Sequence, residues 1–231
     1  MKATIFYGNQ RRGNTYKTMQ IVKEELQKAG EVEFTEFFFP RDLPQFCTGC
    51  QLCLGSPNDS CPHSQSVKPI LDAIIKSDAL IFATPHSGAS MMPAGMKNLF
   101  DHLDFLVLPI APRAEIFRQK ALIVTTGTGS VAASKEIKSV LKHWGVNHIT
   151  SVGLRMFTNK WESMSLSKQA KFEKRLKTAA RRFFKQKKRR PYLETIAFYY
   201  LSKFVLKRYI GPDAYPYQYW QKQGWFTHRP F

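Results

Sequence analysis

The sequence predicts an α/β fold in which a parallel β-sheet is covered by helices on both faces. Three observations lead to this prediction. Short apolar runs alternate along the chain with longer segments whose apolar residues recur every three or four positions. Most of these runs contain almost no polar residue, as expected of strands that are buried on both faces. With 231 residues, 43% of them hydrophobic, the chain can also fill the sizeable core that such a fold needs.

The first part of the chain contains three of the expected strands and three of the expected helices. The helix that begins at Thr15 has apolar residues at Met19, Val22 and Leu26, and Gly30 supplies its C-terminal stop. We expect strands over residues 3–7, 31–39 and 79–83, and helices over residues 15–29, 67–75 and 93–106.

The second part continues the alternation. An apolar run over residues 121–124 predicts a fourth strand, a helix follows to about Trp144, and residues 149–154 predict a fifth strand. Polar loops that contain Gly or Pro follow the first, third and fourth strands. Ligands of parallel sheets bind beyond the C-terminal ends of the strands, so we expect these loops to form one site.

The loop after the first strand, Gly8-Asn-Gln-Arg-Arg-Gly-Asn-Thr15, is a candidate phosphate site. Unpaired N–H groups at a helix start carry the positive end of the helix dipole and can bind a phosphate. Arg11 or Arg12 could add charge-assisted hydrogen bonds to the same oxygens. The loop matches neither the Walker pattern nor Gly-x-Gly-x-x-Gly. An ordinary surface turn before a capped helix is the alternative interpretation.

All four cysteines lie in an irregular segment, residues 40–62, at Cys47, Cys50, Cys53 and Cys61. Spacings of two, two and seven intervening residues allow four thiolates to hold a [4Fe–4S] cluster. Zinc is an alternative ligand, although structural zinc sites more often use two separated pairs. Free thiols, or one or two cysteines that contact the neighbouring pocket, are the third interpretation. We interpret His63 and His102 as structural residues.

Neither a membrane-spanning segment nor a signal peptide is predicted. No run of about 18 uncharged apolar residues occurs, and the N-terminus lacks an apolar stretch. We therefore expect a cytoplasmic protein, in which thiols stay reduced and clustered cysteines indicate metal or redox chemistry.

The net charge of +18 is concentrated in the C-terminal third. Residues 1–150 contain 16 Lys/Arg and 13 Asp/Glu, a net charge of +3, whereas residues 151–231 contain 19 and 4, a net charge of +15. A basic helix with one apolar stripe is expected over residues 165–190. A mostly apolar helix over residues 192–210 and an aromatic tail follow it.

This C-terminal region has three candidate roles. We expect it to pack on the domain or on a second subunit of a homodimer, with the aromatic tail over the ligand pocket. It could instead lie peripherally on an anionic membrane surface, with its aromatic residues in the headgroup layer. Nucleic-acid binding ranks last, because no recognised nucleic-acid motif is present. Lys203, Lys207 and Arg208 exclude a spanning role.

The motifs, taken in order, resemble those of the NAD(P)H-dependent FMN reductases. Residues 8–15 look like a shortened form of that family's phosphate loop. The stretch from Asp78 through Pro85-His86-Ser87-Gly88 to Gly95-Met-Lys97 and Phe100-Asp101 is similar to its second flavin loop and the following helix. The cysteine segment resembles that of the family's iron–sulfur flavoprotein branch. The resemblance covers roughly residues 1–155 and implies a flavodoxin-like, doubly wound, five-stranded parallel sheet of order 2-1-3-4-5 with bound FMN.

The resemblance also implies which residues bind the cofactor. The first loop would hold the FMN phosphate and the two later loops would border the isoalloxazine ring, where glycine lets backbone N–H groups approach the flavin. The implied residues are Asn9, Gln10, Arg11, Asn14, Thr15, Pro85, His86, Ser87, Gly88, Thr126, Gly127, Thr128 and Gly129. No side chain is assigned as an obligatory acid or base, because the cofactor supplies the chemistry. A flexible turn at residues 126–129, and a His86 that only satisfies the backbone, are the alternatives.

Two departures from the family pattern concern substrate preference. The family usually has Pro-Val-Tyr or Pro-x-Trp where this chain has Pro85-His86-Ser87, so an aromatic flavin neighbour is missing. It often has paired acids shortly after the last cysteine, where Cys61 is followed by Pro-His-Ser-Gln-Ser. We expect the substrate preference to differ accordingly.

The functional prediction is therefore an FMN-dependent NAD(P)H oxidoreductase. It would pass hydride from nicotinamide to flavin and on to a small electrophilic acceptor such as a quinone. Residues 1–158 would form the flavodoxin-like FMN-binding domain and residues 159–231 a basic, mainly helical extension. One alternative is an iron–sulfur flavoprotein that carries electrons between a four-cysteine cluster and FMN. An alternative of another class is a non-enzymatic module that binds anionic membrane or nucleic acid through residues 160–210.

Overall fold

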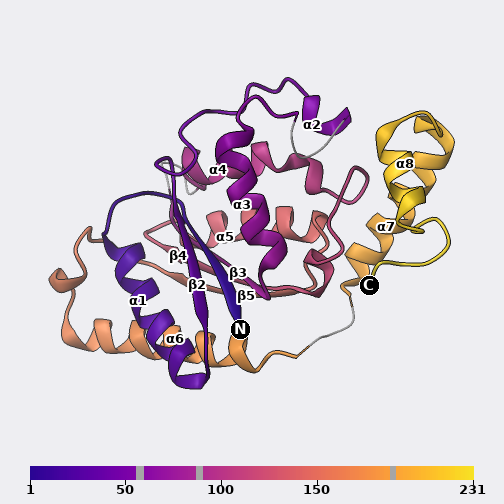
Figure 1. The fold of residues 1–231 in the computed structure, drawn as a ribbon. Helices are drawn as coiled ribbons and strands as arrows, with labels where there is room; N and C mark the ends of the chain where they lie inside the picture. Colours follow the sequence, from indigo (N-terminus) through magenta and orange to yellow (C-terminus); the bar gives the residue numbers. More distant parts are fainter. Residues whose placement is uncertain (56–59, 87–90, 188–190) are drawn as a thin grey trace.

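A five-stranded parallel sheet with strand order β2-β1-β3-β4-β5 forms the centre of the computed structural model (Figure 1), which describes residues 1–55, 60–86, 91–187 and 191–231. The strands are β1 (Lys2–Tyr7), β2 (Glu33–Phe38), β3 (Ala79–Pro85), β4 (Lys120–Thr126) and β5 (His148–Leu154). Every predicted strand is present, and the flavodoxin-like, doubly wound topology is confirmed.

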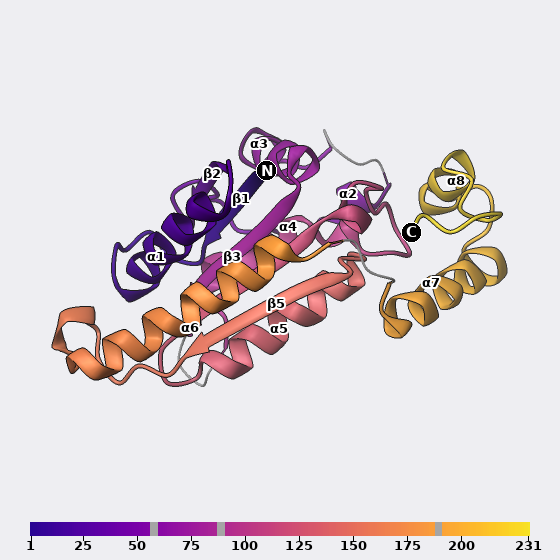
Figure 2. The same cartoon turned by 90° about the horizontal axis from the view of Figure 1, so that it is seen from below.

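Helices cover both faces of the sheet (Figure 2). Helices α1 (Asn14–Ala29) and α6 (Leu166–Lys185) pack on one face, and α3 (Ser64–Lys76), α4 (Ala94–His102) and α5 (Ser130–His143) pack on the other. Short 3-10 turns occupy Asp104–Leu106, Ile116–Arg118 and Trp161–Ser163, and a one-turn helix α2 (Leu52–Gly55) lies in the cysteine segment. The helix expected over residues 93–106 therefore ends at His102 and continues as a 3-10 turn.

Strand β1 shows how the sequence separates the two faces. Ile5 and Tyr7 belong to the cluster formed with α1 and α6, whereas Phe6 belongs to the cluster formed with α3, α4 and α5. All three side chains are buried. Because successive side chains of a strand point to opposite faces, a shift of one residue in the pairing with β3 would exchange the two sets.

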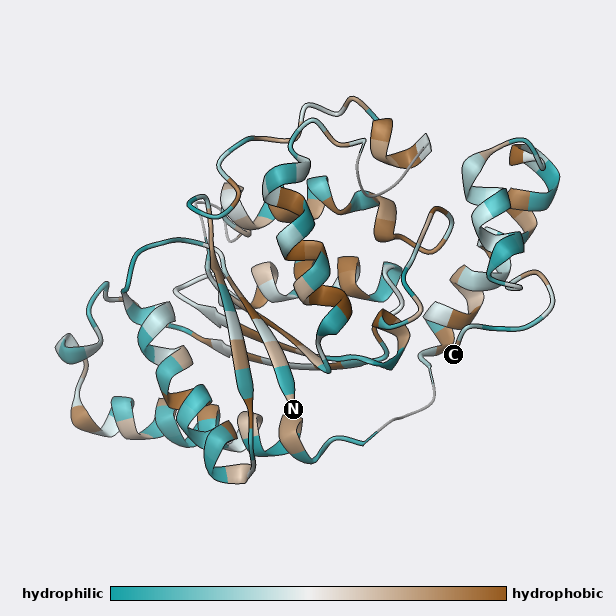
Figure 3. Cartoon of the chain, viewed as in Figure 1, coloured by the Kyte–Doolittle hydropathy of each residue, from teal (hydrophilic) through white to brown (hydrophobic). Residues whose placement is uncertain are grey.

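Helix α6 lies against the sheet, although the sequence analysis assigned it to the C-terminal extension. Its apolar stripe, Phe172, Leu176, Ala180 and Phe183, is buried in the same cluster as α1. The opposite face is basic, and α6 is mostly teal in Figure 3. The boundary between residues 158 and 159 stays a prediction, and it lies before a helix that the core includes.

The last part of the chain forms a separate small unit beside the sheet (Figure 1). Helix α7 (Leu193–Val205) continues as a wider helical turn over Leu206–Ile210, and α8 (Tyr215–Lys222) follows it. The aromatic tail thus contains a helix that the sequence analysis did not predict. Its buried side chains form a third cluster of Leu108, Phe117, Tyr199, Leu206, Trp220 and Trp225.

This unit contacts the loops after α4, not the expected ligand pocket. The indole Nε1 of Trp220 donates a hydrogen bond to the backbone oxygen of Leu108 at 3.0 Å. The hydroxyl of Tyr219 donates to the backbone oxygen of Pro112 at 2.6 Å. Among residues 191–231, none contributes to the pocket described below. Within the described ranges no helix is both long and apolar enough to cross a bilayer.

Candidate functional site

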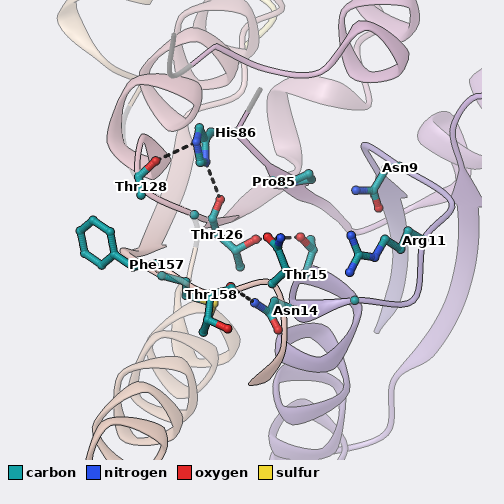
Figure 4. Close-up of a pocket in the computed structure, with 14 residues that line it drawn as sticks. Asn9, Arg11, Asn14, Thr15, Pro85, His86, Thr126, Thr128, Phe157 and Thr158 are labelled. Carbon is teal, nitrogen blue, oxygen red and sulfur yellow. Dashed lines mark hydrogen bonds between the residues drawn. The ribbon is translucent and has the colours of Figure 1, made fainter. Parts of the chain in front are cut away.

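A cavity of about 370 Å³ opens at the C-terminal edge of the sheet (Figure 4). It lies where the loops after β1, β3 and β4 meet, so the structure brings together residues from all three predicted loops. Its lining consists of Asn9, Arg11, Gly13, Asn14, Thr15, Pro85, His86, Thr126, Gly127, Thr128, Met156, Phe157, Thr158 and Asn159.

The start of helix α1 forms one end of this cavity. Gly13 occupies the N-cap position, and no side chain caps the helix. The first turn also contains no acidic residue, so the positive end of the helix dipole is not neutralised there. This end of the cavity can therefore bind an anion.

The two arginines of the first loop point in different directions. Arg11 lines the cavity, and Figure 4 shows its guanidinium directed towards the space between Pro85 and Thr15. Arg12 lies over the ring of Tyr16, with its Cζ atom 5.4 Å from the ring centroid. Arg11 is therefore available to an anion in the cavity, whereas Arg12 stacks on the surface of α1.

Two buried threonines join the first loop to β4. The hydroxyls of Thr15 and Thr126 are 2.7 Å apart and form a hydrogen bond. Both residues are buried, at 5% and 3% exposure. Beside them, Gly8 approaches β3 closely: a Cβ atom on Gly8 would lie 2.2 Å from the Thr84 hydroxyl oxygen. Only glycine fits there without displacing β3.

His86 connects the loops after β3 and β4. Its backbone N–H donates to the oxygen of Thr126 at 3.0 Å, and its ring Nδ1 lies 3.4 Å from the same oxygen. Since a carbonyl only accepts, Nδ1 carries the proton in the neutral ring, and Nε2 accepts from the Thr128 hydroxyl at 2.9 Å. Both nitrogens are engaged within the protein, so the ring positions the cavity wall.

Gly127 makes the close contact between these loops possible. Its φ is +102°, in the region that favours glycine. A Cβ atom there would lie 2.0 Å from His86 Nδ1. Gly127 is therefore required both by its conformation and by the neighbouring ring.

The segment after β5 forms a fourth wall that the sequence analysis missed. Asn14 Nδ2 donates to the backbone oxygen of Thr158 at 2.8 Å, which ties this segment to α1. Phe157 is 77% exposed at the rim. Asn159 and Met156 complete the wall. The available signal was the position of residues 156–159 directly after the fifth predicted strand, at the same sheet edge as the other loops.

Four predicted residues do not line the cavity or cannot be placed. Gln10 is exposed, next to two residues that do line it. Gly129 occupies the N-cap position of α5. Ser87 and Gly88 lie outside the described residues.

Helix α4 anchors the cysteine segment. The buried side chain of Asn98 donates to the backbone oxygens of Leu43 at 3.3 Å and Gln45 at 2.8 Å. Its Oδ1 accepts the backbone N–H of Cys47 at 3.0 Å. Burial raises the pKa of the Cys53 thiol, and the neighbouring thiols of Cys61, Cys47 and Cys50 raise that pKa further. Cys50 is exposed and the other three cysteines are half-buried.

A family model for NADPH-dependent FMN reductases matches residues 1–160. The chain belongs to this family. A curated iron–sulfur flavoprotein of Clostridioides difficile is 25% identical to this reductase over 97% of the chain and 99% of its own length.

Solved structures show the same fold. An NAD(P)H:quinone oxidoreductase from Methanothermobacter marburgensis has a TM-score of 0.64 at 18% identity, covering 81% of this reductase and 99% of its own chain. An NADH:FMN oxidoreductase has a TM-score of 0.53 at 16% identity, covering 80% of this reductase and 91% of its own chain.

The cavity of this reductase fits the family's cofactor. Its volume of about 370 Å³ is within the range of small-molecule sites, about 300–1,000 Å³. The uncapped start of α1 and Arg11 suit a phosphate, and the close approaches at Gly8 and Gly127 leave backbone groups at the cavity wall. The protein is thus an NAD(P)H-dependent flavin oxidoreductase.

Proposed function

We propose that the reductase binds FMN with its phosphate at the start of α1 and its ring between the loops after β3 and β4. The single observation that carries this proposal is the uncapped, acid-free first turn of α1, with Arg11 directed into the same cavity. Bound FMN would accept a hydride from NAD(P)H and deliver it to a second substrate.

The residues that line the cavity would bind the FMN phosphate and position the flavin ring. Arg11 would form charge-assisted hydrogen bonds with phosphate oxygens. The Thr15–Thr126 pair holds the first and third loops together at the phosphate end. The hydrogen bond between His86 and Thr128 would hold the cavity wall beside the flavin ring in place.

We propose a small electrophilic acceptor such as a quinone. Phe157 is exposed at the cavity rim and provides an apolar surface on which a flat ring can stack. It would take the place of the aromatic flavin neighbour that is absent at Pro85-His86-Ser87. The quinone oxidoreductase among the solved structures with this fold supports the choice of acceptor.

Arginine substitutions test the phosphate assignment. Arg11→Ala should weaken FMN binding by roughly 10- to 100-fold, because a hydrogen bond to a charged group contributes about 1.5–3 kcal/mol. Arg12→Ala is the matched control and should leave the affinity within about twofold, because Arg12 stacks on Tyr16. Titration of apoprotein with FMN, followed by flavin fluorescence, gives both constants. Equal affinities for wild type and Arg11→Ala would refute the assignment.

The alternative iron–sulfur function has its own supporting observation, the packing of Cys53 and Cys61 against the same apolar cluster. The name of the Clostridioides difficile relative supports it as well. A cluster at Cys47, Cys50, Cys53 and Cys61 would exchange electrons with the flavin. Iron and sulfide analysis of protein purified without oxygen tests it. One [4Fe–4S] cluster per chain is expected, and stoichiometric FMN without iron would refute it.

We propose, as a second function, that α7 docks on an anionic membrane surface. Leu193, Leu201 and Phe204 are more than half exposed on this helix, and Lys203 and Lys207 lie among them. Apolar side chains flanked by cations, in a region of net charge +15, suit the interface of an anionic bilayer.

Vesicle flotation distinguishes the occupants of this surface. The full-length protein should float with vesicles that contain phosphatidylserine and not with neutral ones. The double substitution Leu201→Ser/Phe204→Ser should abolish flotation, and Leu166→Ser, at another exposed leucine, should not. A dimer that the double substitution dissociates in sedimentation, without flotation of the wild type, would identify a second copy as the occupant. Binding to nucleic acid alone would likewise refute the membrane proposal.

A further inference from the structure

Cys61, His63 and His102 form a compact cluster between the start of α3 and the end of α4. One ligand atom from each residue lies within 4.8 Å of those of the other two. His63 occupies the N-cap position of α3, and His102 is the last residue of α4. The two rings approach with His63 Nδ1 3.0 Å from His102 Nε2. Neither histidine lines the proposed FMN cavity.

The surroundings orient these donor atoms towards one another. His102 Nδ1 lies 3.0 Å from the backbone oxygen of Asn98, which can only accept, so Nδ1 carries the proton. The lone pair of His102 Nε2 therefore faces His63. The backbone N–H of His63 donates to Cys61 Sγ at 3.4 Å, which holds the sulfur beside His63. A histidine whose other nitrogen donates to a backbone carbonyl is the usual arrangement of a metal ligand.

We propose that Cys61, His63 and His102 bind a divalent cation of the zinc class, with a water molecule in the fourth position. One thiolate and two imidazoles are the ligands that Zn²⁺ prefers over Mg²⁺ or Ca²⁺. His102 is 2% exposed, so the cation would be shielded from solvent on that side. The cation would join the cysteine segment to α4.

The required movement is small. With Zn–N of about 2.05 Å and Zn–S of about 2.3 Å, tetrahedral ligand atoms lie about 3.3–3.6 Å apart. The two nitrogens are already 3.0 Å apart. The half-buried Cys61 side chain brings its sulfur closer to the two nitrogens by about 1.2 Å at most, from within 4.8 Å to this spacing.

Binding of the cation moves one proton on His63 and removes one from Cys61. His63 Nδ1 carries the proton of the present hydrogen bond, so this ring changes tautomer and keeps its proton on Nε2. The Cys61 thiol loses its proton when the metal–sulfur bond forms. Binding therefore releases one proton per cation when the thiol is protonated beforehand, and the affinity rises with pH.

A [4Fe–4S] cluster on the four cysteines would also need Cys61, so the two sites exclude each other in one molecule. Two variants distinguish the zinc site from the iron–sulfur cluster. They are His63→Ala, at a half-exposed position, and Cys50→Ser, at an exposed cysteine that is not one of the three proposed zinc ligands. His63→Ala removes a proposed zinc ligand and leaves the four thiols intact. Cys50→Ser removes a cluster ligand and leaves the three zinc ligands intact.

The experiment titrates full-length, metal-free, reduced protein with Zn²⁺ by calorimetry, and with Co²⁺ as a spectroscopic probe. One equivalent is expected per chain, with a thiolate-to-cobalt charge-transfer band and tetrahedral d–d bands. His63→Ala should weaken Zn²⁺ binding at least about 10- to 100-fold, the loss seen when only the supporting partner of a ligand is removed. Cys50→Ser should leave the Zn²⁺ affinity unchanged. Circular dichroism checks that each variant is folded.

Two results would overturn the proposal. One is the absence of saturable Zn²⁺ binding to the wild type. The other is binding that survives in His63→Ala and disappears in Cys50→Ser, which would assign the metal to the four cysteines. The zinc titration does not depend on FMN binding, so the flavin assignment is tested separately by the FMN titration of Arg11→Ala.

Discussion

Gly127 meets two geometric requirements of the cavity wall at once. It combines a left-handed backbone conformation with a close approach to the His86 ring. The sequence could predict that Gly127 lies in a loop at the C-terminal edge of the sheet, because it follows an apolar strand together with Thr126 and Gly129. It could not predict the need for glycine at position 127 in particular, because that need comes from a ring 41 residues earlier in the chain.

Gly127→Ala should therefore impair both stability and cofactor binding. We expect a loss of about 1–3 kcal/mol in the free energy of unfolding, because the left-handed conformation is strained for alanine. FMN affinity should also fall, because the added Cβ displaces His86. Gly55→Ala is the control, since a Cβ atom there meets nothing within 4 Å. Urea unfolding and FMN titration measure the two effects, and wild-type values for Gly127→Ala would contradict this account.

The histidines show the limit of prediction at the residue scale. His63 and His102 are 39 positions apart, and the sequence analysis interpreted both as structural. Only the fold, which places the start of α3 beside the end of α4, brings His63 Nδ1 to 3.0 Å from His102 Nε2. A helix wheel shows which face a residue occupies, but it does not show which residue of a distant element lies opposite.

At the scale of elements, α6 completes the flavodoxin-like layer. Its buried stripe occupies the sheet face beside α1, and Lys120 Nζ donates to the terminal carbonyls of Phe183 and Phe184, both at 2.9 Å. A cation at this position is favoured by the negative end of the helix dipole. The helix therefore belongs to the core packing in spite of its many lysines and arginines.

Phe183→Ala should destabilise the whole flavin domain. Phe183 is fully buried, so its removal should lower the free energy of unfolding by about 3–5 kcal/mol. Leu166→Ala, at an 82% exposed position of the same helix, should change it by less than about 0.5 kcal/mol. Urea unfolding monitored by far-UV circular dichroism measures both variants. Similar losses in the two would mean that α6 does not pack on the sheet.

Elements were predicted best where burial alone determines them. The central strands β1, β3 and β4 are buried, mostly apolar runs, and such runs are visible in the sequence. Helix α8 was missed because its aromatic residues recur mainly at every second position, Tyr215-Pro-Tyr-Gln-Tyr-Trp220, without a clear helical period. Residues 156–159 were missed because they form no helix or strand and are placed by the contact of Asn14 with Thr158.

At the scale of the molecule, the unit of α7 and α8 is joined to the flavin domain through a cluster of its own. Trp220 and Trp225 pack with Leu108 and Phe117 from the loops after α4. The cavity proposed to bind FMN lies at the sheet edge and includes no residue from positions 191–231 that the structure describes. The two regions should therefore respond independently to substitution.

Trp220→Ala should loosen this unit and leave the flavin site unchanged. It removes a buried indole and its hydrogen bond to Leu108, at a cost of about 3–5 kcal/mol to the local packing. Hydrogen exchange of the α7 and α8 amides should accelerate, and FMN affinity should stay within about twofold. Unchanged exchange in α7 would show that Trp220 does not stabilise this helix, and a large loss of FMN affinity would show that the two regions are coupled. Arg12→Ala serves as the reference for unchanged FMN affinity.

Asn98 connects helix α4 to the cysteine segment and to His102. Its side chain fixes the backbone at Leu43, Gln45 and Cys47, and its backbone oxygen accepts from the ring of His102. Small metal domains that fold only around their ion collapse when a chelator removes it. The supports of the site proposed at Cys61, His63 and His102 are hydrogen bonds between protein groups. We therefore expect a chelator to remove the proposed cation without unfolding the protein, which circular dichroism before and after chelation would check.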